Sequence, residues 1–447
     1  MSYQAYATYR DSPIEWAVNI PARWDTCAVK EIFSMQLGKM LQTEVAGPFD
    51  IEVSYLKALH VNWSGVTTEM LPTMWSSPAE LTSYEVKNGD LLVCEGGEVG
   101  RAAVLSGLEE PAIIQNALHR IRATNKGDVR YLKFMLKNIA DAGWFAILCN
   151  KATIAHLTVD KFGAIQMPFP PLEEQQQIAA FLDWKTSQID ALIAKKQELL
   201  QRLKEQRLAV ITQAVTKGLN PDAPMRDSGV AWLGCMPGHW RSLPIKYLLS
   251  AILDTEHKTC PYHDDGDFLV ARTPNVRDGK LELDGAKYTD AAGYQEWTSR
   301  GEPKPGDILF TREAPAGEAC IVPDQPKLCI GQRVVLFRTD AEKLESRFAI
   351  YSLYGGAART FIEMHSLGST VAHFNMSEIA MLPMLVPPVE EQVAIADALD
   401  QRTLRLDSMI TNAQSAITRL TEYRIALITA ATTGKIDVRH VKIPVSD

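Results

Sequence analysis

Two stretches of the chain, residues 170–218 and 387–436, carry apolar side chains that recur every seven positions. A seven-residue repeat kept over four or more heptads predicts a long helix with an apolar seam, as in coiled coils. The predicted seam consists of Ile178, Leu182, Ile189, Leu192, Leu199, Leu203, Val210, Ile395, Leu399, Leu406, Met409, Leu420 and Leu427. Lys185 and Arg402 share one seam position. A polar seam residue can fix register, but we expect both charged ends to reach solvent beside the seam.

Both stretches carry helix start and stop signals. Each follows a proline pair, has two glutamates in its first turn and ends near a glycine, Gly218 or Gly434. At 1.5 Å per residue, such a helix is about 65 Å long and forms a rigid spacer. We expect the two helices to pair with each other. The alternative is that each packs separately on a globular domain.

The two helical stretches are copies of one sequence. Residues 170–216 align with 387–433 without a gap, at an offset of 387 − 170 = 217 positions, and 22 of the 47 aligned positions are identical. Equal sequences build equal surfaces, so the duplication predicts a two-fold or pseudo-two-fold architecture.

The regions between the helices are also copies, but more diverged. Residues 11–24 match 227–240, Gly89-Asp90 matches Gly306-Asp307, and 153–157 matches 370–374. Short apolar runs at 91–93, 308–310 and 334–337 predict strands, and 131–139 and 348–354 predict helices. The expected fold class is α+β: mixed α/β domains at 1–169 and 219–386, joined by helices at 170–218 and 387–447, the latter with a tail. Near-complete divergence between the matched segments is expected if one scaffold carries two specificities.

Composition excludes several classes of protein. The chain is 46% hydrophobic and 22% charged, as in ordinary globular proteins, and has no apolar run that approaches the roughly 20 residues of a membrane span. Seven cysteines without a CxxC pair indicate reduced thiols in a cytoplasmic protein. The net charge of −8 argues against a protein that coats nucleic acid through its overall charge.

No motif predicts catalysis or a bound cofactor. The glycine cluster at 96–100 matches a nucleotide fingerprint poorly, and no P-loop lysine motif occurs. His257, Cys260 and His263 could ligate zinc, but the first α/β domain has no equivalent, and a surface loop explains them better. His156 and His373 occupy matching positions, and we expect structural rather than catalytic roles for them.

The motifs at 170–176, 214–219, 227–240 and 426–437 together resemble the specificity subunit of type I restriction–modification systems. The resemblance spans nearly the whole chain. It implies two target-recognition domains, each reading one half of an interrupted double-stranded DNA site, and two helices that form an antiparallel coiled coil. The coiled coil would set the gap between the half-sites and dock two modification (methyltransferase) subunits. By the same resemblance, S-adenosylmethionine belongs to those subunits, ATP and Mg²⁺ belong to restriction subunits, and this chain is not an enzyme and needs no cofactor or metal.

Candidate DNA contacts are side chains that match base edges, since Arg pairs with guanine and Asn or Gln with adenine. Residues 1–167 contain 15 Lys and Arg against 18 Asp and Glu, so binding must rely on local clusters and on partner subunits. The first domain offers Asn62, Arg101, Gln115, Asn116, Arg120, Asn150 and Lys151. The second offers His257, Lys258, Arg272, Thr273, Asn275, Arg277, Arg312, Gln332, Arg333, His373 and Asn375. Arg272, Asn275 and Arg277 are the foremost candidates, although any of these side chains could instead be solvated or cap a helix.

A second interpretation remains open at this point. The chain could be a structural adaptor whose duplicated domains bind proteins rather than DNA, and a sequence pI near 5.7 is its best support.

Overall fold

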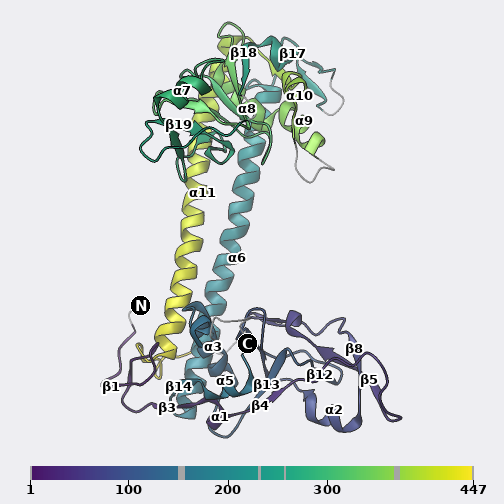
Figure 1. Ribbon diagram of the computed structural model, residues 1–447, viewed down its shortest axis with the longest axis vertical. Coiled ribbons are helices and arrows are strands. Elements are labelled where there is room, and N and C mark those ends of the chain that lie inside the picture. The colour runs from purple at the N-terminus through teal and green to yellow at the C-terminus, as the bar shows by residue number, and fades with distance from the viewer. Residues whose placement is uncertain (1–2, 149–156, 230–232, 256–257, 367–372, 445–447) are drawn as a thin grey trace. The chain divides into compact units, whose positions relative to one another are not determined.

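The computed structural model describes residues 3–148, 157–229, 233–255, 258–366 and 373–444. Contacts divide the chain into one unit of residues 1–196 and 415–447 and a second unit of residues 197–414. Each unit contains one α/β domain together with one half of each long helix, α6 (Leu172–Lys217) and α11 (Val389–Thr432) (Figure 1). The two long helices lie where the heptad pattern predicts them.

The first α/β domain is built on two four-stranded sheets. One is antiparallel, with the order β11-β10-β13-β4, and the other has the order β8-β5-β12-β9. In the second sheet β5 and β12 are parallel, whereas the outer pairs are antiparallel. The strands are β4 (Phe33–Leu37), β5 (Ile51–Leu56), β8 (Thr73–Ser76), β9 (Glu85–Val86), β10 (Leu91–Cys94), β11 (Ala102–Val104), β12 (Ala112–Ile114) and β13 (Leu118–Ala123).

The second α/β domain repeats this topology with one strand fewer. Its antiparallel sheet has the order β18-β26-β23-β24, and its other sheet has the order β22-β19-β25, again with one parallel pair, β19 and β25. The strands are β18 (Leu249–Asp254), β19 (Phe268–Ala271), β22 (Lys287–Thr289), β23 (Ile308–Thr311), β24 (Ala319–Ile321), β25 (Leu328–Ile330) and β26 (Val334–Thr339). The strands predicted at 91–93, 308–310 and 334–337 are confirmed as β10, β23 and β26.

Short strands and helices complete the units. Two helices predicted from sequence are confirmed as α3 (Val129–Asp141) and α8 (Ser346–Gly355), and Asp128 and Glu345 cap their first backbone N–H groups. The other helices are α1 (Val29–Ile32), α2 (Pro78–Tyr84), α4 (Phe145–Leu148), α5 (Val159–Ala164), α7 (Ala291–Trp297), α9 (Ala357–Ser366) and α10 (Met376–Ala380), with 3-10 turns η1 (Ala58–His60), η2 (Ile245–Tyr247) and η3 (Thr273–Asn275). The remaining strands are β1 (Tyr9–Asp11), β2 (Asn19–Pro21), β3 (Asp25–Ala28), β6 (Val61–Asn62), β7 (Gly65–Val66), β14 (Gln166–Phe169), β15 (Met225–Asp227), β16 (Cys235–Pro237), β17 (Arg241–Pro244), β20 (Val276–Arg277), β21 (Lys280–Leu281) and β27 (Pro383–Val386).

The duplicated glutamates at the helix starts fasten each helix to its own domain. The carboxylate of Glu174 accepts a hydrogen bond from the indole N–H of the buried Trp24 at 3.0 Å, and that of Glu391 accepts one from Trp240 at 3.1 Å. These second glutamates of each pair therefore do more than favour the helix dipole: they satisfy the one polar atom of a tryptophan that packs in the core.

The glutamine that follows each glutamate pair is buried and bonds only to backbone. Gln175 donates from its amide nitrogen to the carbonyls of Lys126 and Pro170 at 3.0 and 2.9 Å, and its amide oxygen accepts from the N–H of Asp128 at 3.0 Å. Gln392 makes the same three contacts, with Lys343, Pro387 and Glu345. The duplicated motif thus fixes the approach to α3 and to α8 in the same way.

Within each unit the two helices pack side by side and run antiparallel. In the first unit Asp190 contacts Arg424, while Gln177, further toward the start of α6, bonds to Val438 beyond the end of α11. In the second unit Arg207 contacts Asp407, and the last residues of α6 share one core cluster with the first turns of α11. The pairing expected from the two copies is therefore present in both units.

The predicted register of the seam is correct for one of its two series and wrong for the other. Leu182, Ile189, Leu203, Leu399, Leu406 and Leu427 are buried, as are Ile178 and Ile395 at the domain ends, whereas Val210 and Leu420 are half-buried. Leu192, Leu199 and Met409 are 48%, 38% and 43% exposed and lie outside the seam. Their places are taken by the following residues, Ile193, Leu200 and Ile410, which are half-buried.

Sequence alone could not separate these registers because both satisfy a seven-residue repeat. Leu192 adjoins Ile193, and Leu199 adjoins Leu200, so either neighbour supplies an apolar residue. The true second series also contains polar residues, including Thr186 and Thr403, which are buried and donate their hydroxyls to carbonyls one turn earlier. Because this series contains polar residues, a count of apolar positions does not identify it.

The ion pairs between the two helices use other residues than Lys185 and Arg402. Arg207 meets Asp407 at 2.6 Å and Arg424 meets Asp190 at 2.8 Å, and both pairs are related by the 217-residue offset of the repeat. Lys185 instead lies over the ring of Trp184 at 3.8 Å, and Arg402 is exposed. Arg207 and Arg424 therefore occupy the heptad position that follows the position of Lys185 and Arg402.

Candidate nucleic-acid interface

One edge of each α/β domain gathers polar residues directly after two parallel strands. In the first domain β5 leads into Lys57 and β12 into Gln115 and Asn116. In the second, β19 leads into Arg272 and β25 into Gly331, Gln332 and Arg333. The carboxyl ends of parallel strands meet at one edge of a sheet, and this edge is a frequent ligand site in α/β proteins.

In the second domain this edge is hollowed into a recess of about 250 Å³, which we call the strand-end recess. It is lined by Thr259, Cys260, Tyr262, Val270, Arg272, Thr273, Pro274, Gly331, Gln332 and Arg333. Four residues predicted as DNA contacts from separate parts of the sequence, Arg272, Thr273, Gln332 and Arg333, therefore lie together around one cavity.

Arg272 is the most distinctive side chain of the strand-end recess. Its guanidinium lies over the ring of Tyr262, with its central carbon 5.7 Å from the ring centroid, within the range of a cation–π contact. Its Nη2 donates to the carbonyl of Gly285 at 2.8 Å, and its Nε is buried without a hydrogen-bond partner. An arginine with unused donors beside a cavity is suited to bind a pair of acceptor atoms.

Asn275, expected to read adenine, is instead a structural residue. Its side chain is fully buried, its amide oxygen accepts from the backbone N–H of Arg272 at 3.1 Å, and its amide nitrogen donates to Glu282 at 2.9 Å. The expectation for Asn275 is therefore corrected: this amide shapes the turn η3 that carries Arg272. The neighbouring Thr273 is also buried, at 7% exposure.

Arg333 and His373 converge on one carboxylate next to the strand-end recess. Arg333 forms an ion pair with Glu313, and Nδ1 of His373 contacts the other oxygen of Glu313 at 2.7 Å. His373 also forms an isolated bridge with Glu313 through the backbone, which agrees with the structural role expected for it. The side chain of Arg333 remains about half exposed.

Two further candidates of the second domain have structural roles. Arg312 is 7% exposed and forms an ion pair with Asp254 at 3.0 Å, so it is not free to read a base, and the expectation for it is corrected. Asn375 caps α10 by accepting from the backbone N–H of Glu378 at 2.9 Å. Arg277 is half-buried in β20. Lys258 directly precedes Thr259, which lines the strand-end recess. His257 lies outside the described residues.

In the first domain the candidates are scattered. Arg101 donates to the carbonyl of Ala58 at 2.9 Å and pairs with Glu98, and Arg120 donates to the carbonyl of Ser83, so both hold the fold. Burial lowers the pKa of Arg120. Asn62 is exposed in β6, and Gln115 and Asn116 lie half-buried at the strand end. Asn150, Lys151 and His156 lie outside the described residues.

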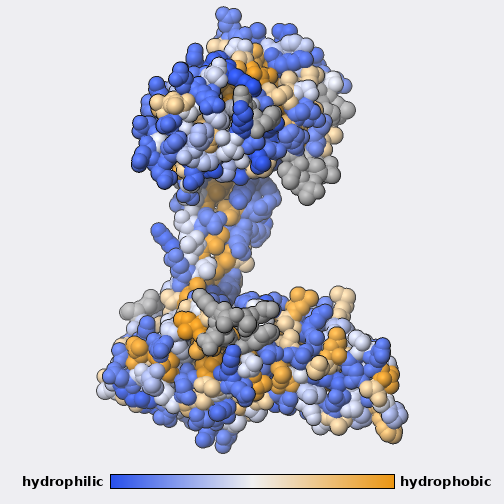
Figure 2. All heavy atoms as spheres, in the orientation of Figure 1, coloured by the Kyte–Doolittle hydropathy of each residue, from blue (hydrophilic) through white to orange (hydrophobic). Residues whose placement is uncertain are grey.

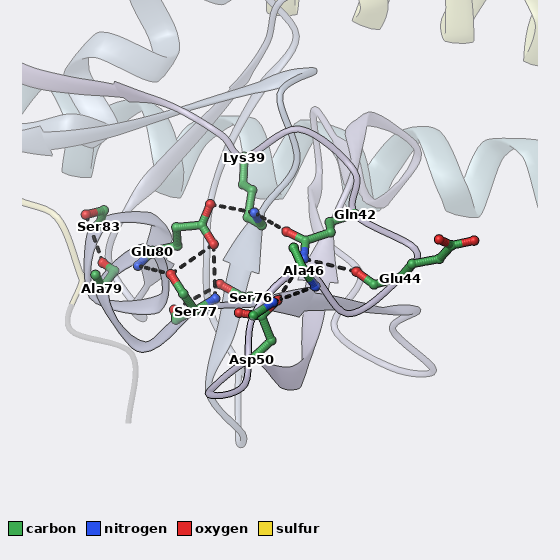
Figure 3. A network of polar contacts seen from close by, with 11 residues as sticks. Lys39, Gln42, Glu44, Ala46, Asp50, Ser76, Ser77, Ala79, Glu80 and Ser83 are labelled. Carbon is green, nitrogen blue, oxygen red and sulfur yellow. Dashed lines mark hydrogen bonds and ion pairs between the residues drawn. The ribbon is translucent and has the colours of Figure 1, made fainter.

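A polar network orders the segment beside the strand end of the first domain (Figure 3). Lys39, whose backbone bridges to Gln115, is buried and donates its ammonium to Glu80 at 2.6 Å and to Gln42 at 2.9 Å. Asp50 accepts three hydrogen bonds, from the N–H groups of Ala46 and Gly47 and from Gln42. The hydrogen bond from Lys39 is the largest influence that lowers the pKa of Glu80, so this carboxylate is ionised at neutral pH.

The strand-end recess offers hydrogen-bond donors and an aromatic face. Burial raises the pKa of the Cys260 thiol, so this cysteine is a protonated wall residue rather than a thiolate. Among the residues that the structure describes, no group of three His, Cys, Asp or Glu side chains could hold a metal ion. No helix in the described ranges is both long and apolar enough to cross a membrane.

Two residues of this edge were missed by sequence reasoning. Tyr262 lies in a segment from which His257 and Lys258 were named as DNA contacts and His257, Cys260 and His263 as possible zinc ligands, but Tyr262 itself was not considered, and neither was Lys57. Lys57 corresponds to Arg272, since each directly follows the parallel strand, and the backbone N–H of each bonds to a side chain three residues later, His60 or Asn275. Lys57 could have been found from the sequence, because it directly follows an apolar strand in the first copy, as Arg272 does in the second.

The sequence matches the family described as the type I restriction modification DNA specificity domain over residues 21–204 and 264–419. It is 21% identical to the type I restriction enzyme MjaVIII specificity subunit of Methanocaldococcus jannaschii, over 95% of either chain. It is 23% identical to the putative MjaX specificity subunit of the same organism, over 80% of this chain and 81% of that one, and 23% identical to the EcoBI specificity subunit of Escherichia coli, over 79% and 75%.

Solved structures share the fold. A chain from a study of complex assembly and conformational transition of the type I R-M system aligns with a TM-score of 0.66 and 15% identity, over 92% of this chain and 98% of that one. The HsdS subunit from Thermoanaerobacter tengcongensis aligns with a TM-score of 0.50 and 16% identity, over 93% and 98%. The matched segments include most of both α/β domains and much of each long helix, and the chain belongs to the family of type I restriction modification DNA specificity domains.

Proposed function

We propose that this chain is the DNA-recognition subunit of a type I restriction–modification complex, in which each α/β domain reads one half of an interrupted site. The observation that carries the proposal is that the two domains share their scaffold contacts but differ at the strand ends. Arg122 pairs with Asp90 as Arg338 pairs with Asp307, and Gln175 and Gln392 make matching backbone bonds. A duplicated scaffold with divergent edges is what two different half-sites require.

The charge of the chain bears on how affinity would arise. Non-specific DNA affinity comes mainly from phosphate neutralisation, and a chain with a net charge of −8 gains little of it from its overall charge. We propose that the modification subunits supply most phosphate contacts, while this chain supplies contacts to base edges.

The two long helices would set the gap between half-sites and dock two modification subunits. Along the paired helices Figure 2 shows apolar residues in orange beside polar residues in blue. Both helices expose large apolar side chains outside their shared seam. They include Leu192, Leu199 and Leu208 on α6 and Leu404, Met409, Tyr423 and Ile425 on α11. Exposed apolar side chains that recur on both copies suit two copies of one protein partner.

The rest of the assembly follows from the same proposal. The modification subunits would bind S-adenosylmethionine and methylate adenine, and the restriction subunits would use ATP and Mg²⁺. This chain would act without chemistry or a cofactor of its own, on DNA in the cytoplasm.

Selection of bound DNA tests the proposed function. The chain, purified with its modification subunits, is incubated with a library of random duplexes, and retained DNA is sequenced. We expect two short specified elements separated by unspecified positions of fixed number. Retention without any sequence preference would contradict the proposal and favour the protein adaptor.

The docking part of the proposal has its own measurement. Leu199→Ala changes an exposed side chain of α6 and should leave the stability of the chain nearly unchanged, since such substitutions cost at most about 0.5 kcal/mol. We expect it to weaken assembly with the modification subunits, measured by mass photometry across a dilution series. Unchanged assembly for Leu199→Ala and for Leu404→Ala would contradict docking at these side chains.

A further inference from the structure

In the strand-end recess a cavity, an arginine with unused donors and an aromatic ring in cation–π range of that arginine coincide. We infer that the strand-end recess reads a base pair of one half-site, with Arg272 contacting guanine and Tyr262 positioning the Arg272 guanidinium. The inference rests on the proposed function and deepens it, because it names the base and the residue that recognises it.

The hydrogen bonding of Arg272 supports this role. Within the described part of the chain, only Nη2 of its guanidinium nitrogens donates a side-chain hydrogen bond, to Gly285. Arg338, by contrast, bonds to both oxygens of Asp307 and to the carbonyl of Glu302. Arg272 therefore keeps hydrogen-bonding capacity for a ligand with acceptor atoms.

The backbone and ring around Arg272 fix its position. Asn275, fully buried, bonds to the N–H of Arg272, and the ring of Tyr262 supports the guanidinium. A planar guanidinium held against an aromatic ring presents its fork in a set direction, and guanine O6 and N7 form the acceptor pair that such a fork matches. Thr273 is buried in the wall, so Gln332 and Arg333 are the other polar groups that border the contact.

The equivalent edge of the first domain has different chemistry. Lys57 takes the place of Arg272, Asn116 follows β12 where Gln332 follows β25, and the flanking segment presents Met40 and Phe49, which are 75% and 77% exposed, where the second domain presents Tyr262. Lysine is a point charge without a planar fork, so it cannot impose the same bidentate contact. The inference therefore assigns the guanine contact to the half-site of the second domain only.

A phosphate could use the same donors, and the experiment separates the two acceptors. Arg272→Lys keeps the positive charge but removes the fork, whereas Arg272→Ala removes both. Arg359→Ala is the matched control, because it deletes one arginine that pairs with Glu363 on α9, away from the strand-end recess. Each variant is purified with the modification subunits, checked by thermal unfolding, and subjected to selection from a random duplex library.

We expect Arg272→Ala and Arg272→Lys to lose about 10- to 100-fold of the preference for guanine at one position of one half-site, the range of a good bidentate contact. The other half-site, and both half-sites in Arg359→Ala, should keep the wild-type preference. Tyr262→Ala should reduce the same preference for guanine. Tyr262→Phe keeps the ring, so it should keep the wild-type preference.

Three outcomes would overturn the inference. One is full guanine preference in both Arg272 variants, and another is an equal loss of binding to all sequences, which marks a phosphate contact. The third is a fall in retention for Arg272→Ala that Arg272→Lys rescues completely, because charge alone would then suffice. If the wild-type chain itself shows no sequence preference, the proposed function fails, and that result is distinct from these three.

Discussion

At the scale of single residues, the duplicated glutamine after each helix start is the clearest structural device. Gln175 and Gln392 satisfy one N–H and two carbonyls each, all on backbone that no regular strand or helix pairs. A buried polar group left without a partner costs about 1–3 kcal/mol, so one side chain secures the junction between a helix and its domain.

Gln175→Leu should therefore destabilise the chain strongly. The leucine fills a similar space but leaves three backbone groups unpaired, and we expect a loss of about 2–4 kcal/mol in the free energy of unfolding. Gln176→Leu, at an exposed neighbouring position, is the matched control and should change stability little. Denaturant titration of both variants measures the difference, and equal stability would show that the three hydrogen bonds are not structural.

Two histidines of the first domain should make stability depend on pH. Burial lowers the pKa of His119, which is fully buried and bonded to the carbonyl of Leu157, and burial also lowers the pKa of His60. Because their folded pKa values lie below the unfolded value of about 6.5, the unfolded state takes up protons first as pH falls. The stability that they contribute is present above pH 6.5 and is lost as pH falls below it.

We expect the unfolding free energy to fall by at most about 1.4 kcal/mol per pH unit and histidine between pH 6.5 and 5. His119→Gln keeps a donor toward Leu157 but does not titrate, so its stability should depend less on pH than that of the wild type. Thermal unfolding from pH 7.5 to 5 compares the two proteins. Parallel pH profiles would exclude His119 as a source of the dependence.

At the scale of elements, the seam of the long helices is the main correction to sequence reasoning. One of the two predicted seam series was correct, and the other was placed one residue early at Leu192, Leu199 and Met409. Leu199 and Leu200 differ only in which helix face they occupy, with Leu199 38% exposed and Leu200 half-buried. This adjacent pair of equal residues allows a test in which chemistry is constant and only the register changes.

Leu200→Ala should destabilise the chain by about 1–2 kcal/mol, at the low end for a large-to-small change because the site is half-buried. Leu199→Ala should cost less than about 0.5 kcal/mol. Denaturant titration of the two variants gives the comparison. A larger loss of stability for Leu199→Ala than for Leu200→Ala would contradict the observed register and place Leu192 and Leu199 in the seam.

The sequence predicted the long helices, the α+β class and several strands because each has a local signal. Heptads mark α6 and α11, and apolar runs bounded by Gly-Asp mark β10 and β23. The strand-end recess has no such signal, because residues 272 and 332 meet through the parallel pairing of β19 with β25, and residue 262 comes from a segment outside both strands. Burial of Asn275 and Arg312 likewise depends on tertiary packing that side-chain type does not reveal.

At the scale of the whole molecule, the account is that two dissimilar readers are carried on one repeated scaffold. Shared contacts such as Arg122 with Asp90 and Arg338 with Asp307 keep the scaffold constant, and the strand ends are free to differ. Reading and spacing then become separate properties, since the readers lie on the α/β domains and the spacing is assigned to α6 and α11.

Insertion of one heptad into both α6 and α11 tests this separation most directly. Seven residues add about 10 Å of helix, close to the rise of three base pairs at 3.4 Å each, and keep the seam in phase. Methylated adenines are mapped in a host that expresses the variant with its modification subunits. The account predicts the same two half-sites separated by a longer gap; altered half-site bases with an unaltered gap would contradict it.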